Sequence, residues 1–174
     1  VCSSDLAMLT LLHIRNVVLI DQMSLDFRAG LSALTGETGA GKSILLDSLG
    51  LALGARADAG LVRKGTDQAV VSAEFHLDDD HPVFSVIQEQ GIVAQSPLIL
   101  RRILGSDGRS RAYINDEPVS ISFLKEVGEA LVDIHGQFET YGLLNPATHR
   151  EMLDLYAGHM SVLRDMAAAY QAVK

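Results

Sequence analysis

The chain has 174 residues, of which 48% are hydrophobic, and its formal net charge is −8. This length suffices for a domain with its own core, and no apolar run approaches the length of a membrane span. The acidic balance argues against a self-sufficient nucleic-acid binder, but it leaves room for a local basic patch at Arg101, Arg102, Arg109 and Arg111. The single cysteine, Cys2, excludes an internal disulfide and fits a reducing cytoplasm.

The acidic and histidine residues do not form a recognisable metal-binding pattern. Asp78, Asp79 and Asp80 are typical of a solvated turn, and His76 and His81 have no further zinc ligands nearby in the sequence. Residues 1–7 lack the charged and apolar regions of a signal peptide. Because a strand-like run opens at residue 8, a methionine, we expect the natural chain to start there and residues 1–7 to be extraneous.

The first predicted elements are strands in quick succession. Residues 9–20 are apolar and β-branched in patches and indicate one or two strands with a kink. Residues 23–27 alternate as a half-buried strand does. A turn at residues 28–30 then leads into a short buried strand over residues 31–35.

A complete phosphate-binding motif of the form G-x-x-x-x-G-K-[ST] follows that strand. It consists of Gly36, Glu37, Thr38, Gly39, Ala40, Gly41, Lys42 and Ser43. The glycines permit backbone angles that a Cβ blocks, so successive N–H groups, those of Glu37 and Thr38 included, form an anion-binding nest. We expect Lys42 to reach the β- and γ-phosphates and the Ser43 hydroxyl to ligate Mg²⁺.

The flanks support this motif against a chance glycine-rich turn. Residues 44–53 are good helix formers, and Gly54 is a natural C-terminal stop. Strand, loop and helix occur in the order that the mechanism needs, and the helix dipole favours phosphate at its N-terminus. The sequence therefore predicts binding of a nucleoside triphosphate.

The remaining elements up to residue 131 alternate strands with short helices. A loop at residues 54–65 carries Arg63, and a strand over residues 69–77 presents alternate apolar residues. The other expected elements are a helix at residues 82–90 stopped by Gly91, strands at 98–104 and 111–115 around a hairpin turn, a turn at 116–118, and a helix from Ser120 or Ser122 to residue 131.

The last segment begins after Asn145 and Pro146, which suit the start of a helix. Large or apolar residues then recur at alternating steps of four and three, as in a coiled coil. They are Met152, Tyr156, His159, Leu163, Met166, Tyr170 and Val173. An ordinary amphipathic surface helix is the alternative, but the pattern stops without a cap, which favours the beginning of a longer helix.

Several segments in this order resemble the RecN family, the bacterial SMC-like ATPases of DNA double-strand break repair. The segments are residues 8–16, 19–21, 36–47, 108–115, 131–137 and 143–146. The resemblance implies an ABC-type ATPase head whose two lobes are separated by a long antiparallel coiled coil. Residues 8–145 are then the N-terminal lobe, an α/β P-loop NTPase unit with an antiparallel β subdomain, and residues 146–174 begin the coiled-coil arm.

The resemblance also implies roles for two residues outside the phosphate motif. Gln137 falls in the Q-loop, where its amide oxygen is expected near the γ-phosphate, on Mg²⁺ or its water. Arg63 matches the position of an arginine that reaches the nucleotide in SMC-like heads, and a solvated loop cation is the alternative. After the Q-loop the chain carries Phe138 and Thr140 where the family tends to have histidines.

By the same resemblance the complete protein binds ATP and Mg²⁺ and pairs this lobe with a C-terminal lobe. It is then expected to be a homodimer through head engagement and the coiled coil, and to hold or bridge DNA ends. Its expected location is the cytoplasm, at the nucleoid, and no membrane partner is expected. Hydrolysis in this class needs a strand ending in a carboxylate pair and a Leu-Ser-Gly-Gly-type signature. This chain contains neither, so it is expected to carry half of the site.

Three alternatives remain from the sequence. The chain could be the head of another SMC-like or transporter-type ATPase, although a transporter ATPase should not run into a coiled-coil pattern. A P-loop kinase or GTPase would need an arginine-rich lid or an Asn-Lys-x-Asp motif, and neither is present. As an isolated fragment, the chain could be a nucleotide-binding module that does not hydrolyse ATP.

Overall fold

The computed structural model describes residues 7–36 and 41–132 as continuous stretches. In the last segment it describes Leu153, Asp154, Ala157, His159, Val162, Met166, Ala169 and Tyr170. The chain divides into two compact units, residues 1–132 and residues 133–174, and each is described by itself.

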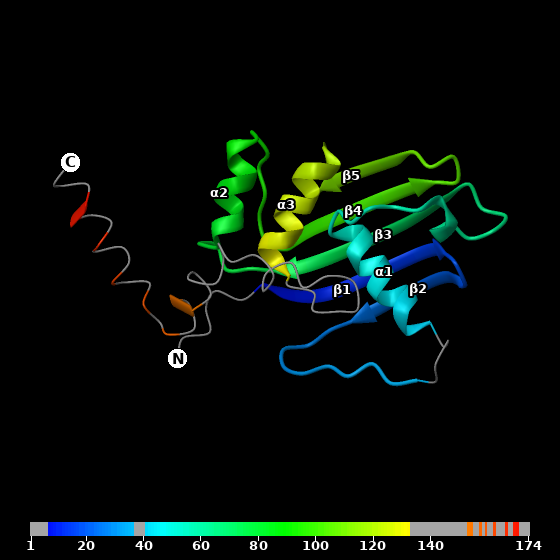
Figure 1. The fold of residues 1–174 in the computed structure, drawn as a ribbon, viewed down its shortest axis with the longest axis horizontal. Helices are drawn as coiled ribbons and strands as arrows, with labels where there is room; N and C mark the ends of the chain where they lie inside the picture. Colours follow the sequence, from blue (N-terminus) through cyan, green and yellow to red (C-terminus); the bar gives the residue numbers. More distant parts are fainter. Residues whose placement is uncertain are drawn as a thin grey trace. The chain divides into compact units, whose positions relative to one another are not determined.

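The first unit is built on one antiparallel sheet of six strands in the order β2-β1-β3-β4-β5-β6 (Figure 1). The strands are β1 (Met8–Val17), β2 (Ile20–Asp26), β3 (Gln68–His76), β4 (Leu98–Gly105), β5 (Ser110–Ile114) and β6 (Glu117–Val119). The kinked segment predicted at residues 9–20 is a tight hairpin, because β1 turns into β2 at Val18 and Leu19. The predicted β4–β5 hairpin is confirmed, with Leu104 opposite Ser110.

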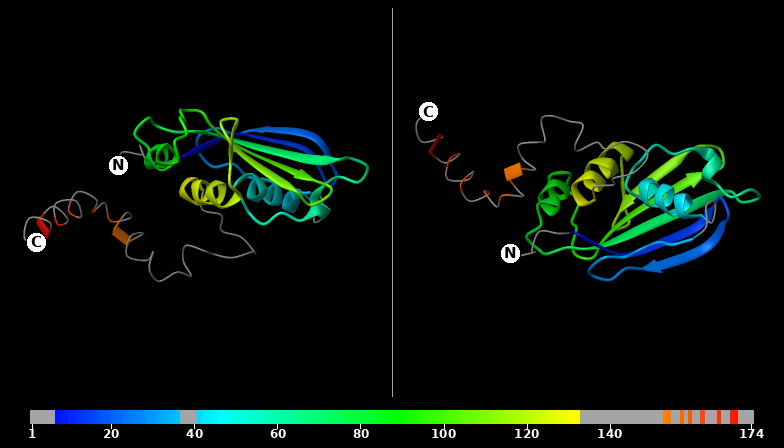
Figure 2. Two further views of the ribbon diagram at one scale, coloured as in Figure 1. Left: turned by 90° about the horizontal axis from the view of Figure 1, so that it is seen from above. Right: turned by 60° about the horizontal axis from the view of Figure 1, so that its bottom comes forward.

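Three α-helices and one 3₁₀ turn accompany the sheet: α1 (Lys42–Ala52), α2 (Pro82–Glu89), α3 (Ile121–Leu131) and η1 (Ala59–Leu61). Figure 2 shows α1 and α3 on the same face of the sheet. His81 caps α2, because its Nδ1 accepts a hydrogen bond from the Val83 N–H at 3.2 Å. Ser120 caps α3 by accepting from the Phe123 N–H at 3.1 Å, which decides between the two serines considered from the sequence.

The core lies between the sheet and the helices on this face. Strand alternation sends every second side chain toward the helices, and on β3 the buried side chains are Ala69, Val71, Ala73 and Phe75. The opposite face of the sheet is half-exposed and polar, with His13, Ser72, Arg101 and Tyr113 in one cross-strand row. The sheet is therefore covered on one side, as antiparallel sheets commonly are.

Two expectations about local structure are wrong. Residues 31–35 form no strand, and the first leucine of the run, Leu31, is fully exposed. An isolated extended segment gains little without a neighbouring strand, and among the described residues this one has no β partner. The turn expected at residues 116–118 lies earlier, at Asn115 and Asp116, whose φ angles are 44° and 69°, and it is followed by β6.

The second unit contains the predicted heptad pattern. Six of its eight described residues are in helical conformation, and the Ala157 N–H donates to the Leu153 carbonyl at 2.9 Å, as in an α-helix. Met166 and Tyr170, both on the predicted seam, are largely exposed. The other seam positions, His159 excepted, lie outside the described residues, so the coiled coil stays a prediction.

Candidate nucleotide-binding site

The first turn of α1 has the geometry of an anion-binding helix start. Gly41, the N-cap of α1, has φ 93° and ψ 2°, in the left-handed region that disfavours a side chain. It has no side chain to cap the helix, and the first N–H groups of any α-helix lack intrahelical partners. The glycine that the motif requires before Lys42 therefore gives the helix no side-chain cap of its own, and N–H groups at a helix start suit phosphate.

The Lys42 side chain folds back across the motif. Its ammonium group donates a hydrogen bond to the carbonyl oxygen of Gly36, the first residue of the motif. The two ends of the motif are thereby close together, as a loop that encloses a phosphate requires. Ser43 lies in the first helical turn and is exposed, where its hydroxyl is open to a metal ion.

The other predicted phosphate-loop residues, Glu37, Thr38, Gly39 and Ala40, lie outside the described residues. The described part of the motif fits a Mg²⁺–nucleotide because it combines a left-handed glycine, a helix start without a side-chain cap from that glycine, a cation and a hydroxyl. Among the described residues there is no cluster of three or more His, Cys, Asp or Glu side chains that could bind a metal ion alone. Among the described residues of the motif, Ser43 is the one that offers a hydroxyl to such a metal ion.

The far end of α1 is fixed to α3 by two glycines, Gly54 after α1 and Gly128 in α3. A Cβ placed on Gly54 would lie 2.6 Å from the Lys125 backbone, so the chain at this point touches α3 without side chains between them. Inside the helix the Ser48 hydroxyl donates to the Ile44 carbonyl at 2.6 Å, which satisfies a fully buried polar group. The helix that begins at Lys42 is thus held from its C-terminal end.

Leucines stay exposed both on α1 and in the segment before it. Leu46 is 53% exposed and Leu34 is 52% exposed. A helix that is apolar on several sides is usually buried on several sides. This surface flanks the phosphate loop, so any protein segment that covers it would also approach the nucleotide.

Arg63 lies beside the β1–β2 turn. Its backbone N–H donates to the Asn16 carbonyl at 3.0 Å, and the neighbouring Val62 pairs with Val17 in an isolated β-bridge. Its guanidinium Nη1 lies 3.6 Å from the Asp21 carboxylate Oδ1. The structure therefore brings Arg63 together with Asp21, a residue that the sequence did not single out.

The position of Asp21 shows on which face of the sheet the Arg63 side chain lies, because the two side chains form an ion pair. Along β2, Met23 and Leu25 pair with Ile14 and Leu12, which are buried under the helices. By strand alternation Asp21 lies on this same face. In Figures 1 and 2, α1 begins at the end of the sheet where β1 turns into β2. Arg63 is therefore on the side of the sheet that carries the start of α1.

Gln137 lies outside the described residues. The structure does describe the chain some residues before it, because α3 ends at Leu131 and Val132 is extended. The role of Gln137 therefore stays a prediction, together with its nearness to the γ-phosphate.

The local basic patch considered from the sequence loses Arg102, whereas Arg101 and Arg111 share the open face of the sheet. Arg101 and Arg102 are neighbours in β4 and project to opposite faces. On the open face, the Arg101 Cζ lies 4.6 Å from the Tyr113 ring centroid, and the Arg101 Nη2 lies 2.7 Å from the Asp116 Oδ1. Arg102 is only 2% exposed, and burial lowers the pKa of its guanidinium.

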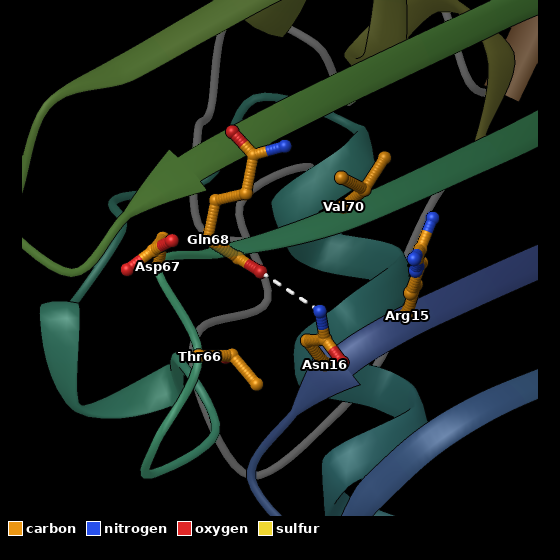
Figure 3. Close-up of a pocket in the computed structure, with 6 residues that line it drawn as sticks. All are labelled: Arg15, Asn16, Thr66, Asp67, Gln68 and Val70. Atoms are coloured by element: carbon orange, nitrogen blue, oxygen red, sulfur yellow. Dashed lines mark hydrogen bonds between the residues drawn. The ribbon is translucent and has the colours of Figure 1, made fainter.

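A shallow hollow of about 420 Å³ lies at the end of β1 and the start of β3 (Figure 3). Within it the Asn16 amide donates to the Gln68 carbonyl at 3.2 Å. The lining residues are Arg15, Asn16, Thr66, Asp67, Gln68 and Val70. None of the predicted phosphate ligands lines it, and its opposed charges at Arg15 and Asp67 do not define a ligand.

The one-sided antiparallel sheet and the phosphate-loop helix define the N-terminal lobe of a P-loop ATPase head. The chain belongs to the AAA domain family, whose sequence pattern matches residues 11–135. It is 44% identical over 164 residues to the DNA repair protein RecN of Vibrio cholerae, covering 94% of this chain and 30% of that protein. It is 41% identical to the RecN of Haemophilus influenzae, covering 96% of this chain and 30% of that protein.

The resemblance to RecN stated from the sequence is thereby confirmed, and the chain spans about 30% of the length of these relatives. Among solved structures, the Smc head domain with a coiled coil and joint from Pyrococcus yayanosii superposes with a TM-score of 0.62 at 18% identity. That comparison covers 95% of this chain and 35% of the other. It confirms the fold expected for an SMC-type head. No helix in the described part of the chain is long and apolar enough to cross a bilayer.

Proposed function

We propose that the chain is the ATP-binding half of an SMC-like ATPase that acts in recombinational DNA repair. The observation that carries the proposal is the closed phosphate motif, in which Gly41 is left-handed and Lys42 reaches back to Gly36. In this proposal Mg²⁺–ATP binds to residues 36–43, with Ser43 and Gln137 on the metal side and Arg63 toward the phosphates. The repair role is supported by the similarity to RecN proteins.

Hydrolysis would require the rest of the complete protein. The chain has no apolar strand ending in a carboxylate pair and no signature motif. We propose that a C-terminal lobe of the same protein covers the apolar surface at Leu34 and Leu46 and brings those groups to the nucleotide. Covering a leucine fully is worth about 1.5–3 kcal/mol, which favours a stable association of the lobes.

We propose that ATP drives the engagement of two heads in a homodimer, and that this engagement is coupled to holding or bridging DNA ends. The heptad pattern after residue 151 would begin the coiled-coil arm that joins the lobes, and the site of action would be the cytoplasm at the nucleoid. A second function applies to the chain by itself, which we expect to bind nucleotide without hydrolysing it because it lacks the carboxylate pair.

Binding of a fluorescent ATP analogue to the 174-residue chain, with and without Mg²⁺, tests the central claim. Lys42→Ala should abolish binding, because it removes the cation that faces the phosphate loop. Lys64→Ala is the matched control, since it removes the same charge from an exposed loop and should leave the affinity unchanged. Equal affinity in the wild-type chain and Lys42→Ala would refute the site.

A further inference from the structure

The β1–β2 turn and the segment that carries Arg63 form one rigid element. Val18 has a φ of 46°, which is strained for a β-branched residue, and Asn16 has a φ of 57°. The Val18 N–H donates to the Leu61 carbonyl at 2.9 Å, and the Arg63 N–H donates to the Asn16 carbonyl at 3.0 Å. These bonds, with the buried Val17, hold the turn in its strained form.

The Arg63 backbone is held from the other side as well. Its carbonyl accepts from the Thr66 N–H at 3.1 Å and from the Thr66 hydroxyl at 2.8 Å. The Cα position of Arg63 is therefore fixed relative to the sheet. Any change in what Arg63 contacts must come from rotation of its side chain.

The guanidinium, in contrast, is held weakly. Within the described part of the chain its contact is the ion pair with Asp21, at 3.6 Å, which is too long for a hydrogen bond. The Asp21 side chain is 81% exposed. Exposed ion pairs of this kind are easily exchanged, because water and salt screen them.

From these contacts we infer that Arg63 pairs with Asp21 when no nucleotide is bound, and that the phosphates of a bound nucleotide displace Asp21 from this ion pair. This inference rests on the proposed function, because it takes the phosphate loop as the nucleotide site. A triphosphate carries more negative charge than one carboxylate and offers several acceptor oxygens in a geometry that guanidinium matches. Asp21 is thus a positioning residue that keeps Arg63 on the nucleotide side of the sheet and competes with nucleotide for it.

A double-mutant cycle on ATP-analogue affinity tests the exchange. Asp21→Asn should tighten binding about two- to fivefold, the range expected for releasing one exposed ion pair. In an Arg63→Gln background the same substitution should give no such gain, because the competition has been removed. Asp26→Asn is the matched control, since Asp26 lies on the same strand but pairs with Leu11 on the open face, and it should change nothing.

Three results of the cycle would overturn the exchange: unchanged or weaker binding in Asp21→Asn, an equal gain in the Arg63→Gln background, or an equal gain from Asp26→Asn. An equal gain in the Arg63→Gln background, or an equal gain from Asp26→Asn, would indicate that removing any negative charge favours ATP-analogue binding. Failure of the proposed function looks different, since the wild-type chain and Lys42→Ala would then bind ATP analogue equally poorly. The Arg63 Nε–H resonance in NMR spectra gives a second measurement, because both Asp21→Asn and ATP should shift it, whereas Asp26→Asn should not.

Discussion

Gly128 in α3 packs directly against the backbone carbonyl of Leu53 at the end of α1. A Cβ on Gly128 would lie 2.5 Å from that oxygen and 3.0 Å from the Leu53 Cβ. Leu53 is the C-cap of α1, the helix that starts with Lys42, and Gly54 follows it. In the sequence, α3 leads toward Gln137. The helix that follows the phosphate motif and the helix that precedes Gln137 in the sequence are therefore joined through a contact of backbone with backbone.

Gly128→Ala should destabilise the first unit by about 1–3 kcal/mol, because the added methyl group must push α3 away from α1. Thermal or urea unfolding followed by circular dichroism measures the change. Gly50→Ala is a matched control in α1, since its Cβ would make an ordinary contact of 3.6 Å with Ala55. Alanine is the better helix former by about 1 kcal/mol, so this control should be neutral or stabilising. Equal destabilisation by both substitutions would contradict the close approach.

Hydrolysis by the 174-residue chain should be negligible even where ATP binds. The chain offers a phosphate loop but no carboxylate pair to hold the metal and activate water. Phosphate release should rise when the remaining part of the complete protein is supplied on a second chain. Robust turnover by the purified 174-residue chain would show that its site is complete and would contradict the division into two lobes.

Local structure in this chain could be predicted where short-range rules decide it. The helix between Lys42 and Gly54 and the β4–β5 hairpin depend on propensity and glycine within a few residues, and the start of α3 depends on a serine cap that the sequence narrowed to Ser120 or Ser122. The strand expected at residues 31–35 was wrong because a strand depends on a partner, which local pattern does not report. The pairing of Arg63 with Asp21 was also hidden, because it joins residues 42 positions apart through the β1–β2 turn.

The local sequence pattern also does not report that the Arg102 side chain is buried. Its Nε donates to the Ser110 hydroxyl at 2.5 Å. Its Nη1, by contrast, finds no hydrogen-bond partner among residues 7–36 and 41–132. A buried cation without full compensation costs stability. Arg102→Met, which keeps the length of the side chain, should therefore be neutral or stabilising by about 1–3 kcal/mol in urea unfolding.

The effect of Arg102→Met should not depend on pH between 5 and 9. Burial lowers the folded-state pKa of Arg102 below its ordinary value. For a base, such a shift penalises folding at every pH below the folded pKa, and the penalty fades only as the pH rises through the interval between the two values. Arginine remains charged throughout the accessible range, so the penalty is constant there. A stabilisation that disappears at pH 9 would show that Arg102 loses its proton in the fold.

Val18 offers a separate test of the strained β1–β2 turn. At its φ of 46° a β-branched residue is disfavoured, whereas glycine is not. Val18→Gly relieves that strain but also makes the unfolded chain more flexible, so the free energy of unfolding should stay within about 1 kcal/mol of the wild-type value. Val70→Gly is the matched control, since this half-buried strand residue should lose about 1 kcal/mol or more through lost packing and added entropy. Equal losses at the two sites in urea unfolding would mean that the turn carries no strain, and would remove the reason for treating it as a rigid support for Arg63.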